Sequence, residues 1–325
     1  MSGLYLAPME ELTGYAFRNT LSRHFGGVDK YFTPFISCDN RIMKTRSSRE
    51  LDPSNNKGLN VVPQLLTNDK DQFNEAAKLI ADLGYEEINI NFGCPSNTVA
   101  SKFKGSGILR APDIMQRFLD GVFNDEGSAL RDNPNLRISV KTRVGYNDTS
   151  DFENVIRLLN TYPFSEVIVH PRLKKDLYNG KPRMEMFDAA CEKIRCSSIV
   201  YNGDVISPED HNAILSRYSD RPHSVDAVMI GRGAIGYPGL FRQIRTGTRM
   251  TVDELYAFLT DLFEIYKDDC GPQPAVAKMK EVWSYTCSLI EDKDERARVH
   301  KSIIKAKDEN AYRDAAAVAK RSFRL

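Results

Sequence analysis

Residues 71–97 read DQFNEAAKLIADLGYEEININFGCPSN, and they contain the unit from which the fold is predicted. In the first half, apolar residues recur at the spacing of one helix face, from Asp71 to near Gly84. The run at 87–91 is short, apolar and bounded by residues that break regular structure, as in a buried strand. This stretch therefore predicts a helix, then a strand, then a loop at the carboxyl end of the strand that carries Cys94.

The same unit continues in both directions along the chain. Strand-like runs occur at 4–7, 31–36, 60–65, 87–91, 137–141, 166–170, 198–201 and 227–230, with helical patterns between them. Several, such as ISVK, VIVH and AVMI, are almost continuous in apolar residues, which is typical of parallel strands covered on both faces. We expect a (β/α)8 barrel of the TIM type over residues 1–245. The alternative is a doubly wound open sheet, although no GxGxxG loop follows the first run.

The pattern changes near Arg249. Residues 252–266, 276–290 and 298–323 have helical periodicity, and no strand-like run lies between them. The segment CGPQP at 270–274 is expected to be a linker between two of these helices. We therefore expect residues 246–325 to form a small helical domain after the barrel.

Composition excludes several classes of protein. The chain has 41% hydrophobic and 27% charged residues and a net charge of +1, which is ordinary for a globular protein and gives no overall field for a polyanion. Locally, residues 296–325 hold nine basic and three acidic side chains. Such a cluster is either a solvated helix face or a surface for a polyanion such as RNA.

Nothing in the sequence indicates secretion, a membrane or a metal. The first residues lack a basic segment and a long apolar run, and no stretch of about 18 apolar residues exists. The six cysteines are scattered without CxxC spacing, as expected of reduced thiols in the cytoplasm rather than of disulfides or metal ligands. We expect a cytoplasmic protein that acts as a monomer.

Polar or reactive residues follow most of the strand-like runs. They are Pro8, Met9 and Glu10 after the first run, Gln64 in the third, Asn91 and Cys94 with the fourth, Lys141 and Arg143 with the fifth, His170 and Arg172 with the sixth, Asn202, Gly203 and Asp204 after the seventh, and Gly231 and Arg232 after the eighth. Taken alone, each could be an ordinary structural or solvated residue. Because the active site of a (β/α)8 barrel lies at the carboxyl ends of its strands, their convergence predicts an active site there.

The seventh and eighth runs end in glycine-rich turns. Asn202-Gly203-Asp204 and Gly231-Arg232-Gly233 would expose backbone N–H groups, and Arg232 would add a charged fork. In these barrels this position commonly binds phosphate. The alternative is two ordinary turns, but together they indicate a cofactor that carries phosphate.

A set of motifs in chain order resembles those of the tRNA-dihydrouridine synthases. They are APM at Ala7, NFGCPS at 91–96, GSGIL at Gly105, VKTR at Val140, VHPR at Val169, NGDV at Asn202 and MIGRGA at Met229. The resemblance implies an FMN-binding (β/α)8 barrel followed by a helical domain that helps to hold tRNA. It further implies reduction of a uridine in tRNA to 5,6-dihydrouridine, with NADPH reducing the flavin.

Under this resemblance Cys94 matches the proton donor of the family. Reduction of the uracil C5=C6 bond needs a hydride on one carbon and a proton on the other, and a thiol with a pKa of about 8.5 is mostly protonated at neutral pH. Lys141 matches a lysine that contacts the flavin and would stabilise its anionic reduced form.

The other residues take binding roles by resemblance. Pro8, Met9, Glu10 and Gln64 match positions around the flavin ring; His170 matches a residue of the FMN and substrate pocket; Asn202, Gly203, Asp204, Gly231 and Arg232 match the ribityl and phosphate contacts. Asn91 is a candidate to hydrogen-bond the base. Arg143, Arg172 and Tyr178 are candidates for tRNA contact at the mouth, or are simply solvated.

Two alternatives remain beside the tRNA enzyme. The first is a flavin-dependent reductase of a free pyrimidine or another small molecule, in which the terminal helices would be structural. The second is a non-catalytic RNA-binding protein that keeps the barrel. The presence of both Cys94 and Lys141 favours an enzyme.

Overall fold

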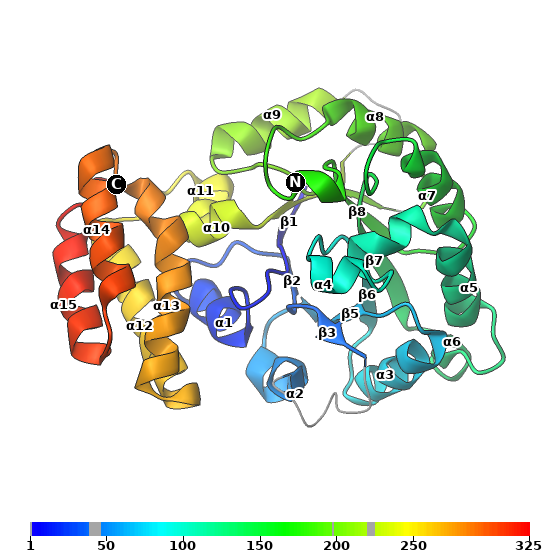
Figure 1. The fold of residues 1–325 in the computed structure, drawn as a ribbon, viewed down its shortest axis with the longest axis horizontal. Helices are drawn as coiled ribbons and strands as arrows, with labels where there is room; N and C mark the ends of the chain where they lie inside the picture. Colours follow the sequence, from blue (N-terminus) through cyan, green and yellow to red (C-terminus); the bar gives the residue numbers. More distant parts are fainter. Residues whose placement is uncertain (1, 39–46, 197, 220–224) are drawn as a thin grey trace.

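The computed structural model describes residues 2–38, 47–196, 198–219 and 225–325, and it shows a parallel barrel with a group of helices along one side (Figure 1). The strands are β1 (Gly3–Leu6), β2 (Lys30–Phe32), β3 (Ile36–Ser37), β4 (Val61–Val62), β5 (Gln64–Leu66), β6 (Glu87–Phe92), β7 (Arg137–Arg143), β8 (Glu166–His170), β9 (Ile199–Tyr201) and β10 (Ala227–Ile230). Each of the recorded strand pairings is parallel.

The sheet closes on itself. β1 pairs with β10, from Gly3 opposite Ala227 to Leu6 opposite Ile230. β2 and β3 pair with β4 and β5 respectively, so these four short strands are the two halves of two neighbouring strands. Pro34 and Pro63 lie at the breaks, where proline removes a ladder donor. Among the described residues the strands therefore fill eight positions of a closed ring, which confirms the (β/α)8 barrel and excludes the open sheet.

The expected strand positions are confirmed, with two corrections. Runs 166–170 and 227–230 coincide with β8 and β10, whereas runs 31–36 and 60–65 are each split into two strands. The first helix of the opening stretch, α3 (Lys70–Asp82), begins one residue before Asp71 because Asp69 is its N-cap. The Asp69 carboxylate accepts from the backbone N–H of Asp71 at 2.9 Å and of Gln72 at 3.1 Å.

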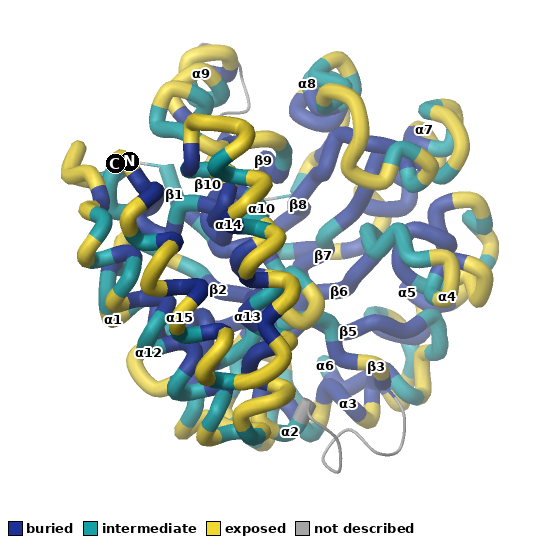
Figure 2. Tube along the Cα trace, turned by 60° about the vertical axis from the view of Figure 1, so that its left-hand side comes forward, coloured by how far each residue is buried: buried dark blue, intermediate teal, exposed yellow. Residues whose placement is uncertain are grey.

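Helices cover the outside of the barrel (Figure 2). They are α1 (Tyr15–His24), α2 (Ser47–Leu51), α5 (Pro112–Phe123), α7 (Asp151–Leu159), α8 (Met184–Lys193), α9 (Pro208–Tyr218) and α11 (Leu240–Thr246), together with α3 and the short α4 (Asn97–Ala100), α6 (Ala129–Asp132) and α10 (Arg232–Gly236). The 3-10 turns η2 (Pro53–Asn56), η3 (Gly105–Arg110) and η4 (Lys174–Asp176) complete the loops. α7 is typical, since Phe152, Val155 and Leu159 face the core while its other side faces solvent.

Four helices and one 3-10 turn follow the barrel. They are α12 (Val252–Cys270), α13 (Pro272–Thr286), η5 (Cys287–Leu289), α14 (Lys293–Lys305) and α15 (Glu309–Lys320), on the left of Figure 1. α12 packs on α1, where the ring of Phe258 meets that of Phe17 edge-on at 5.6 Å. None of the helices in the described ranges is long and apolar enough to cross a bilayer.

Two expectations for this region are wrong. Residues 298–323 form parts of two helices, because Asp308 caps a new one by accepting from the N–H of Ala311 at 2.9 Å. Residues 270–274 are not a linker, since Gly271 alone separates α12 from α13 with a φ of 85° and Pro272 opens the next helix.

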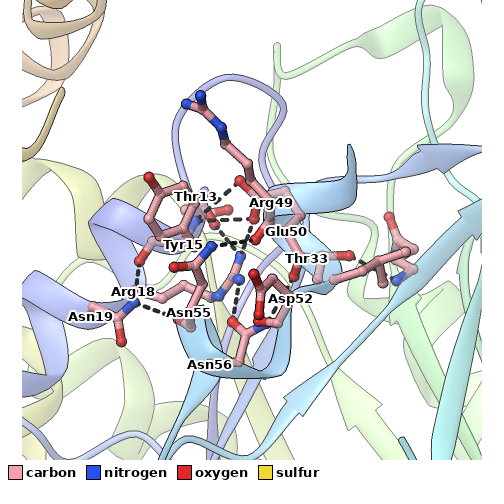
Figure 3. A network of polar contacts seen from close by, with 12 residues as sticks. Thr13, Tyr15, Arg18, Asn19, Thr33, Arg49, Glu50, Asp52, Asn55 and Asn56 are labelled. Carbon is pink, nitrogen blue, oxygen red and sulfur yellow. Dashed lines mark hydrogen bonds and ion pairs between the residues drawn. The ribbon is translucent and has the colours of Figure 1, made fainter. Parts of the chain in front are cut away.

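A buried polar network holds the loop after β1 (Figure 3). The Arg18 guanidinium lies 2.8 Å from the Glu50 carboxylate and donates to the carbonyl of Thr13 and to the Asn56 side chain. Glu50 also accepts from the N–H of Tyr15, the first residue of α1. The network ties α1 to α2 and η2, and so fixes the loop that carries Pro8, Met9 and Glu10.

Candidate active site

A cavity of about 360 Å³ lies at the carboxyl ends of the strands. Most of the predicted site residues line it: Pro8, Met9, Glu10, Asn91, Cys94, Lys141, Arg143, His170, Tyr178, Asn202, Gly203, Asp204, Gly231 and Arg232. Gln64 and Arg172 do not. The volume falls in the range typical of sites for small molecules and cofactors.

The loop after β6 holds Cys94 by its backbone. The Asn91 side-chain carbonyl accepts from the N–H of Gly93 at 3.0 Å and of Cys94 at 2.8 Å. The Cys94 carbonyl accepts from both the N–H and the hydroxyl of Ser106. Gly105, with a φ of 54°, comes so close that a Cβ would lie 2.9 Å from that carbonyl. The GSGIL motif therefore supports the turn that carries the thiol.

The Cys94 thiol is partly buried in the cavity wall. Burial raises its pKa, and Glu10 adds to this, while the Ser96 backbone N–H, Arg143 and Lys141 act in the opposite direction. The net shift is upward, so the thiol is protonated at neutral pH. A protonated thiol beside two cations can release a proton to a bound ligand, because the cations stabilise the thiolate that remains.

Lys141 projects into the same cavity from β7. Burial, together with Arg143, lowers its pKa to about 7. Within the part of the chain that the structure describes, its Nζ has no hydrogen bond or ion pair with a protein group. Lys141 is partly buried, and an amine in that position without an anionic partner is costly, so the site suits a ligand that places an anion or a carbonyl oxygen against it.

His170 is neutral at the end of β8. Burial lowers its pKa well below the usual value, and Arg143, Lys141, Arg172 and Arg232 add to the effect. Arg172 lies 3.3 Å from His170 Nε2. Because a guanidinium can only donate, Nε2 accepts and the proton sits on Nδ1. The imidazole ring stacks on Tyr178 with centroids 6.4 Å apart.

Two of the predicted tRNA contacts are not solvated side chains. Arg172 is 1% exposed, donates to both carboxylate oxygens of Asp204 at 2.8 and 2.6 Å, and also donates to the carbonyl of Gly180. Arg143 is also 1% exposed and donates to the carbonyls of Gly93 and Leu173. Arg172 therefore supports the site from behind, whereas Arg143 forms part of the cavity wall. Tyr178 is exposed at the mouth, as expected.

Gln64 lies beneath the cavity rather than in its wall. Its side chain is fully buried, accepts from the Asn91 amide at 2.7 Å and donates to Asn89 at 2.7 Å. Through these contacts it orients Asn91, which does line the cavity.

The two glycine-rich turns approach their neighbours closely. A Cβ at Gly203 would lie 2.0 Å from the Tyr201 hydroxyl oxygen, and a Cβ at Gly233 would lie 2.1 Å from the Val205 carbonyl oxygen. Arg232, beside Gly231, donates to Asp204 at 2.7 Å. Burial by itself would raise the pKa of Asp204, but Arg172 and Arg232 hold it below its usual value.

Reasoning from the strand ends missed Tyr285. This residue belongs to α13, yet its side chain lines the cavity together with residues of the barrel loops. Burial raises its pKa, and nearby Tyr178 adds to this. Phe35 and Leu177 were missed as well. No motif in the helical region marks a tyrosine that reaches the barrel, so only the tertiary structure reveals it.

Comparison with known families decides what this site belongs to. A family model described as dihydrouridine synthase matches residues 5–317. The chain belongs to the dihydrouridine synthase family. It is therefore an oxidoreductase that works with a flavin, as the resemblance of the motifs indicated.

Curated relatives of this chain have similar lengths. Proteins named tRNA-dihydrouridine synthase B from Vibrio cholerae and Pseudomonas aeruginosa are both 28% identical, over 84% and 92% of this chain and 84% and 88% of their own. A protein named tRNA-dihydrouridine(16) synthase from Aquipseudomonas alcaligenes is 27% identical over 85% of this chain and 87% of its own.

Among solved structures, morphinone reductase shares the barrel fold of this chain. Its TM-score is 0.53 at 10% identity, over 77% of this chain and 87% of that one. At this identity the likeness shows the barrel alone.

The residues that line the cavity suit a flavin. Lys141 offers a cation that no described protein group neutralises, and the turns at Gly203 and Gly231 bring backbone close to the cavity beside Arg232. In the described residues no cluster of His, Cys, Asp or Glu is arranged to hold a metal ion.

Proposed function

We propose that this chain reduces a uridine of tRNA to 5,6-dihydrouridine, with FMN as its flavin and NADPH as the reductant. The observation that carries the proposal is the pairing of two side chains in one cavity, a thiol kept protonated at Cys94 and an unpartnered amine at Lys141. Family membership and the names of the tRNA-modifying relatives support the substrate.

A flavin bound in the cavity would supply the hydride. Cys94 Sγ–H donates the proton to the other carbon of the uracil double bond, and Arg143 and Lys141 stabilise the thiolate that remains. Lys141, which lines the cavity, would hold the flavin and stabilise the negative charge that the flavin gains on reduction. Neutral His170 would offer its Nδ1–H to a ligand in the cavity, and the turns at Gly203 and Gly231, with Arg232, would hold the phosphate of FMN.

The mouth of the cavity suits a planar base. Tyr178 is exposed there and Tyr285 lines the wall, while Arg143 and Arg232 lie 5.5 and 4.9 Å from the centroid of the Tyr178 ring. An aromatic group between such side chains gains stacking and cation–π energy. A uridine flipped out of the tRNA fold would enter by this route.

The tRNA body would lie on the helical region, which we assign as a domain over residues 246–325 beside a catalytic barrel over 1–245. Its basic side chains fall into two groups. Arg313 and Lys320 are neutralised by acidic partners, Glu309 and Asp253 among them. By contrast, Lys301, Lys305 and Arg321 are exposed and have no ion pair among the described residues, so they remain available to phosphates.

The test is a reconstituted reaction. Purified protein is incubated with FMN, NADPH and unmodified tRNA transcript, and dihydrouridine is measured by mass spectrometry of the digested RNA. Product in the transcript, with little from free uridine, supports the proposal. Reduction of free uridine without binding of tRNA would indicate a small-molecule reductase, and protein that cannot be loaded with a flavin would indicate a non-catalytic role.

Replacing Cys94 with alanine tests the mechanism. Because a positioned general acid typically contributes about 10²- to 10⁴-fold, Cys94→Ala should lose that much of the rate while keeping the flavin absorbance. Cys270→Ala, which changes an exposed thiol outside the cavity, is the matched control and should behave as wild type. Undiminished product from Cys94→Ala would refute the role of the acid.

A further inference from the structure

We propose that a hydrogen-bond chain through the barrel interior positions the Cys94 turn and fixes which way the Asn91 amide faces the cavity. In this scheme Asn89 and Ser139 are positioning residues that touch neither flavin nor substrate. The inference rests on the proposed function only for the role of Cys94, whereas the chain of hydrogen bonds is a feature of the fold.

The chain runs without a gap from the cavity to the opposite end of the barrel. The backbone N–H of Cys94 donates to Asn91 at 2.8 Å, and Asn91 donates to Gln64 at 2.7 Å. Gln64 donates to Asn89 at 2.7 Å, Asn89 to the Ser139 hydroxyl at 3.0 Å, and Ser139 to the Glu87 carboxylate at 2.8 Å. The strands that provide these residues, β5, β6 and β7, are neighbours in the sheet.

The hydrogen-bonded side chains are buried in the barrel interior. Gln64, Asn89 and Ser139 have no exposed surface, and Asn91 and Glu87 are each 7% exposed. Positions 87, 89 and 91 alternate along β6, so they share its inward face. In such surroundings each hydrogen bond is stronger than in water, and an amide left without its partner is expensive.

The far end of the chain is anchored. Glu87 and Glu166 are the first residues of β6 and β8, and Lys30 bridges their carboxylates at 3.1 and 3.3 Å. The Tyr5 hydroxyl adds a hydrogen bond to Glu166 at 2.8 Å. Lys30 thus holds Glu87 in place at the amino ends of the strands, which is the end of the barrel opposite the cavity.

The two ends dictate the direction of every bond between them. A backbone N–H can only donate and a carboxylate can only accept, so each amide in the chain has one possible orientation. The Asn91 carbonyl is fully used by the N–H groups of Gly93 and Cys94. What Asn91 can offer the cavity is therefore its second amide hydrogen, which takes an acceptor such as a carbonyl oxygen and rejects an amino group.

Asn89 is the position at which to test this, because it is buried away from the cavity. Asn89→Leu removes both the acceptor for Gln64 and the donor to Ser139. Asn89→Asp is the conservative variant, since a buried carboxyl that stays protonated carries a carbonyl acceptor and an O–H donor in the same places. Thr20→Val is the matched control, as it removes a buried hydroxyl bonded to the Ala16 carbonyl on α1, outside the chain.

Two readouts separate positioning from general loss of stability. In flavin-loaded protein, alkylation of Cys94 by iodoacetamide should be about tenfold faster in Asn89→Leu, the factor associated with losing one buried hydrogen bond. With tRNA, kcat should fall by a similar factor while KM stays within about threefold. Asn89→Asp and Thr20→Val should stay within about threefold of wild type in both.

The positioning role of the hydrogen-bond chain is refuted if Cys94 is alkylated at the same rate in Asn89→Leu and in Thr20→Val. It is also refuted if Asn89→Asp is as impaired as Asn89→Leu. Should Asn89→Leu fail to fold, Ser139→Ala takes its place. It removes both the acceptor of the Asn89 amide and the donor to Glu87 but leaves the bond between Gln64 and Asn89, so it should show the same pattern more weakly. Alkylation of Cys94 needs no substrate. If Asn89→Leu changes the alkylation rate but the wild-type protein does not reduce tRNA, the positioning role of the hydrogen-bond chain is supported and the proposed function is refuted.

Discussion

At the scale of single residues, charge inside the cavity is unbalanced. Lys141 and Arg143 project from β7, and His170 is kept neutral by burial and, in addition, by the cations around it. Asp204 is already shared by Arg172 and Arg232. The cations of the cavity therefore outnumber its carboxylates, which favours anionic ligands.

Lys141 should make the stability of the flavin-free protein depend on pH. Its folded-state pKa is about 7 and its ordinary value is 10.5, so between these the unfolded chain binds more protons and stability rises with pH. Below pH 7 the penalty of the buried charge is fully present. Lys141→Met should abolish the rise and be more stable than wild type at pH 6 by roughly 1–3 kcal/mol, measured by urea unfolding. Parallel curves for the two proteins from pH 6 to 10 would contradict this.

At the scale of elements, strands were predicted better than the contacts between them. β8 and β10 were placed at their true ends because strands buried on both faces have an unbroken apolar pattern. The breaks at Pro34 and Pro63 were visible in the sequence, since proline interrupts a ladder, but the apolar pattern runs through them. The same holds for Asp308, a helix-capping residue inside a longer helical pattern.

The location of the candidate site was predicted from the ends of the strands, but the side-chain contacts within it were not. Strand ends placed Cys94 and Lys141 in the cavity. The local sequence pattern could not show that Arg172 would form an ion pair with Asp204, 32 residues away. Nor could it show that Gln64 would accept a hydrogen bond from Asn91 instead of lining the cavity wall. Such pairings depend on which strands become neighbours, which no short segment encodes.

The network around Arg18 should dominate the stability of the α1 region. Arg18→Met leaves the Glu50 carboxylate buried without its partner, and breaking such a pair typically costs about 3–5 kcal/mol. Arg49→Ala removes an exposed arginine of the same network (Figure 3) and should cost less than about 1 kcal/mol. Chemical denaturation of both variants decides this, and equal losses would show that the buried pair has no special weight.

At the scale of the whole molecule, the helical region packs against the barrel and contributes a residue to its cavity. α12 packs on α1, α13 packs on α10, and Tyr285 of α13 enters the wall of the cavity. The exposed Lys301 and Lys305 belong to α14, which lies with α12, α13 and α15 along one side of the barrel (Figure 1).

Tyr285→Ala should lower kcat/KM for tRNA by about tenfold or more, because stacking of a base on an aromatic ring is worth about 1–3 kcal/mol. The flavin spectrum should not change. Tyr285→Phe keeps the ring and serves as the control, with activity close to wild type. If the phenylalanine variant is as slow as the alanine variant, the hydroxyl rather than the ring is what matters.

Neutralising Lys301, Lys305 and Arg321 together to glutamine should weaken tRNA binding and flatten its salt dependence. Each lost phosphate contact reduces the slope of log K against log salt by about 0.7–0.9. The control is Arg117, Arg157 and Lys193→Gln, three exposed cations on α5, α7 and α8 of the barrel exterior. Binding titrations at several salt concentrations that show the same slope for both variants would place the RNA on another surface.

The pairing of β1 with β10 also bears on how the protein is made. Residues 3–6 leave the ribosome long before residues 227–230 are translated, and at roughly 5–20 residues per second the interval is on the order of ten to fifty seconds. During this interval β1 can already pair with β2, but the edge of β1 that pairs with β10 lacks its partner strand. Assistance by molecular chaperones during synthesis would thus matter more for this enzyme than for one whose first strand finds its neighbours early.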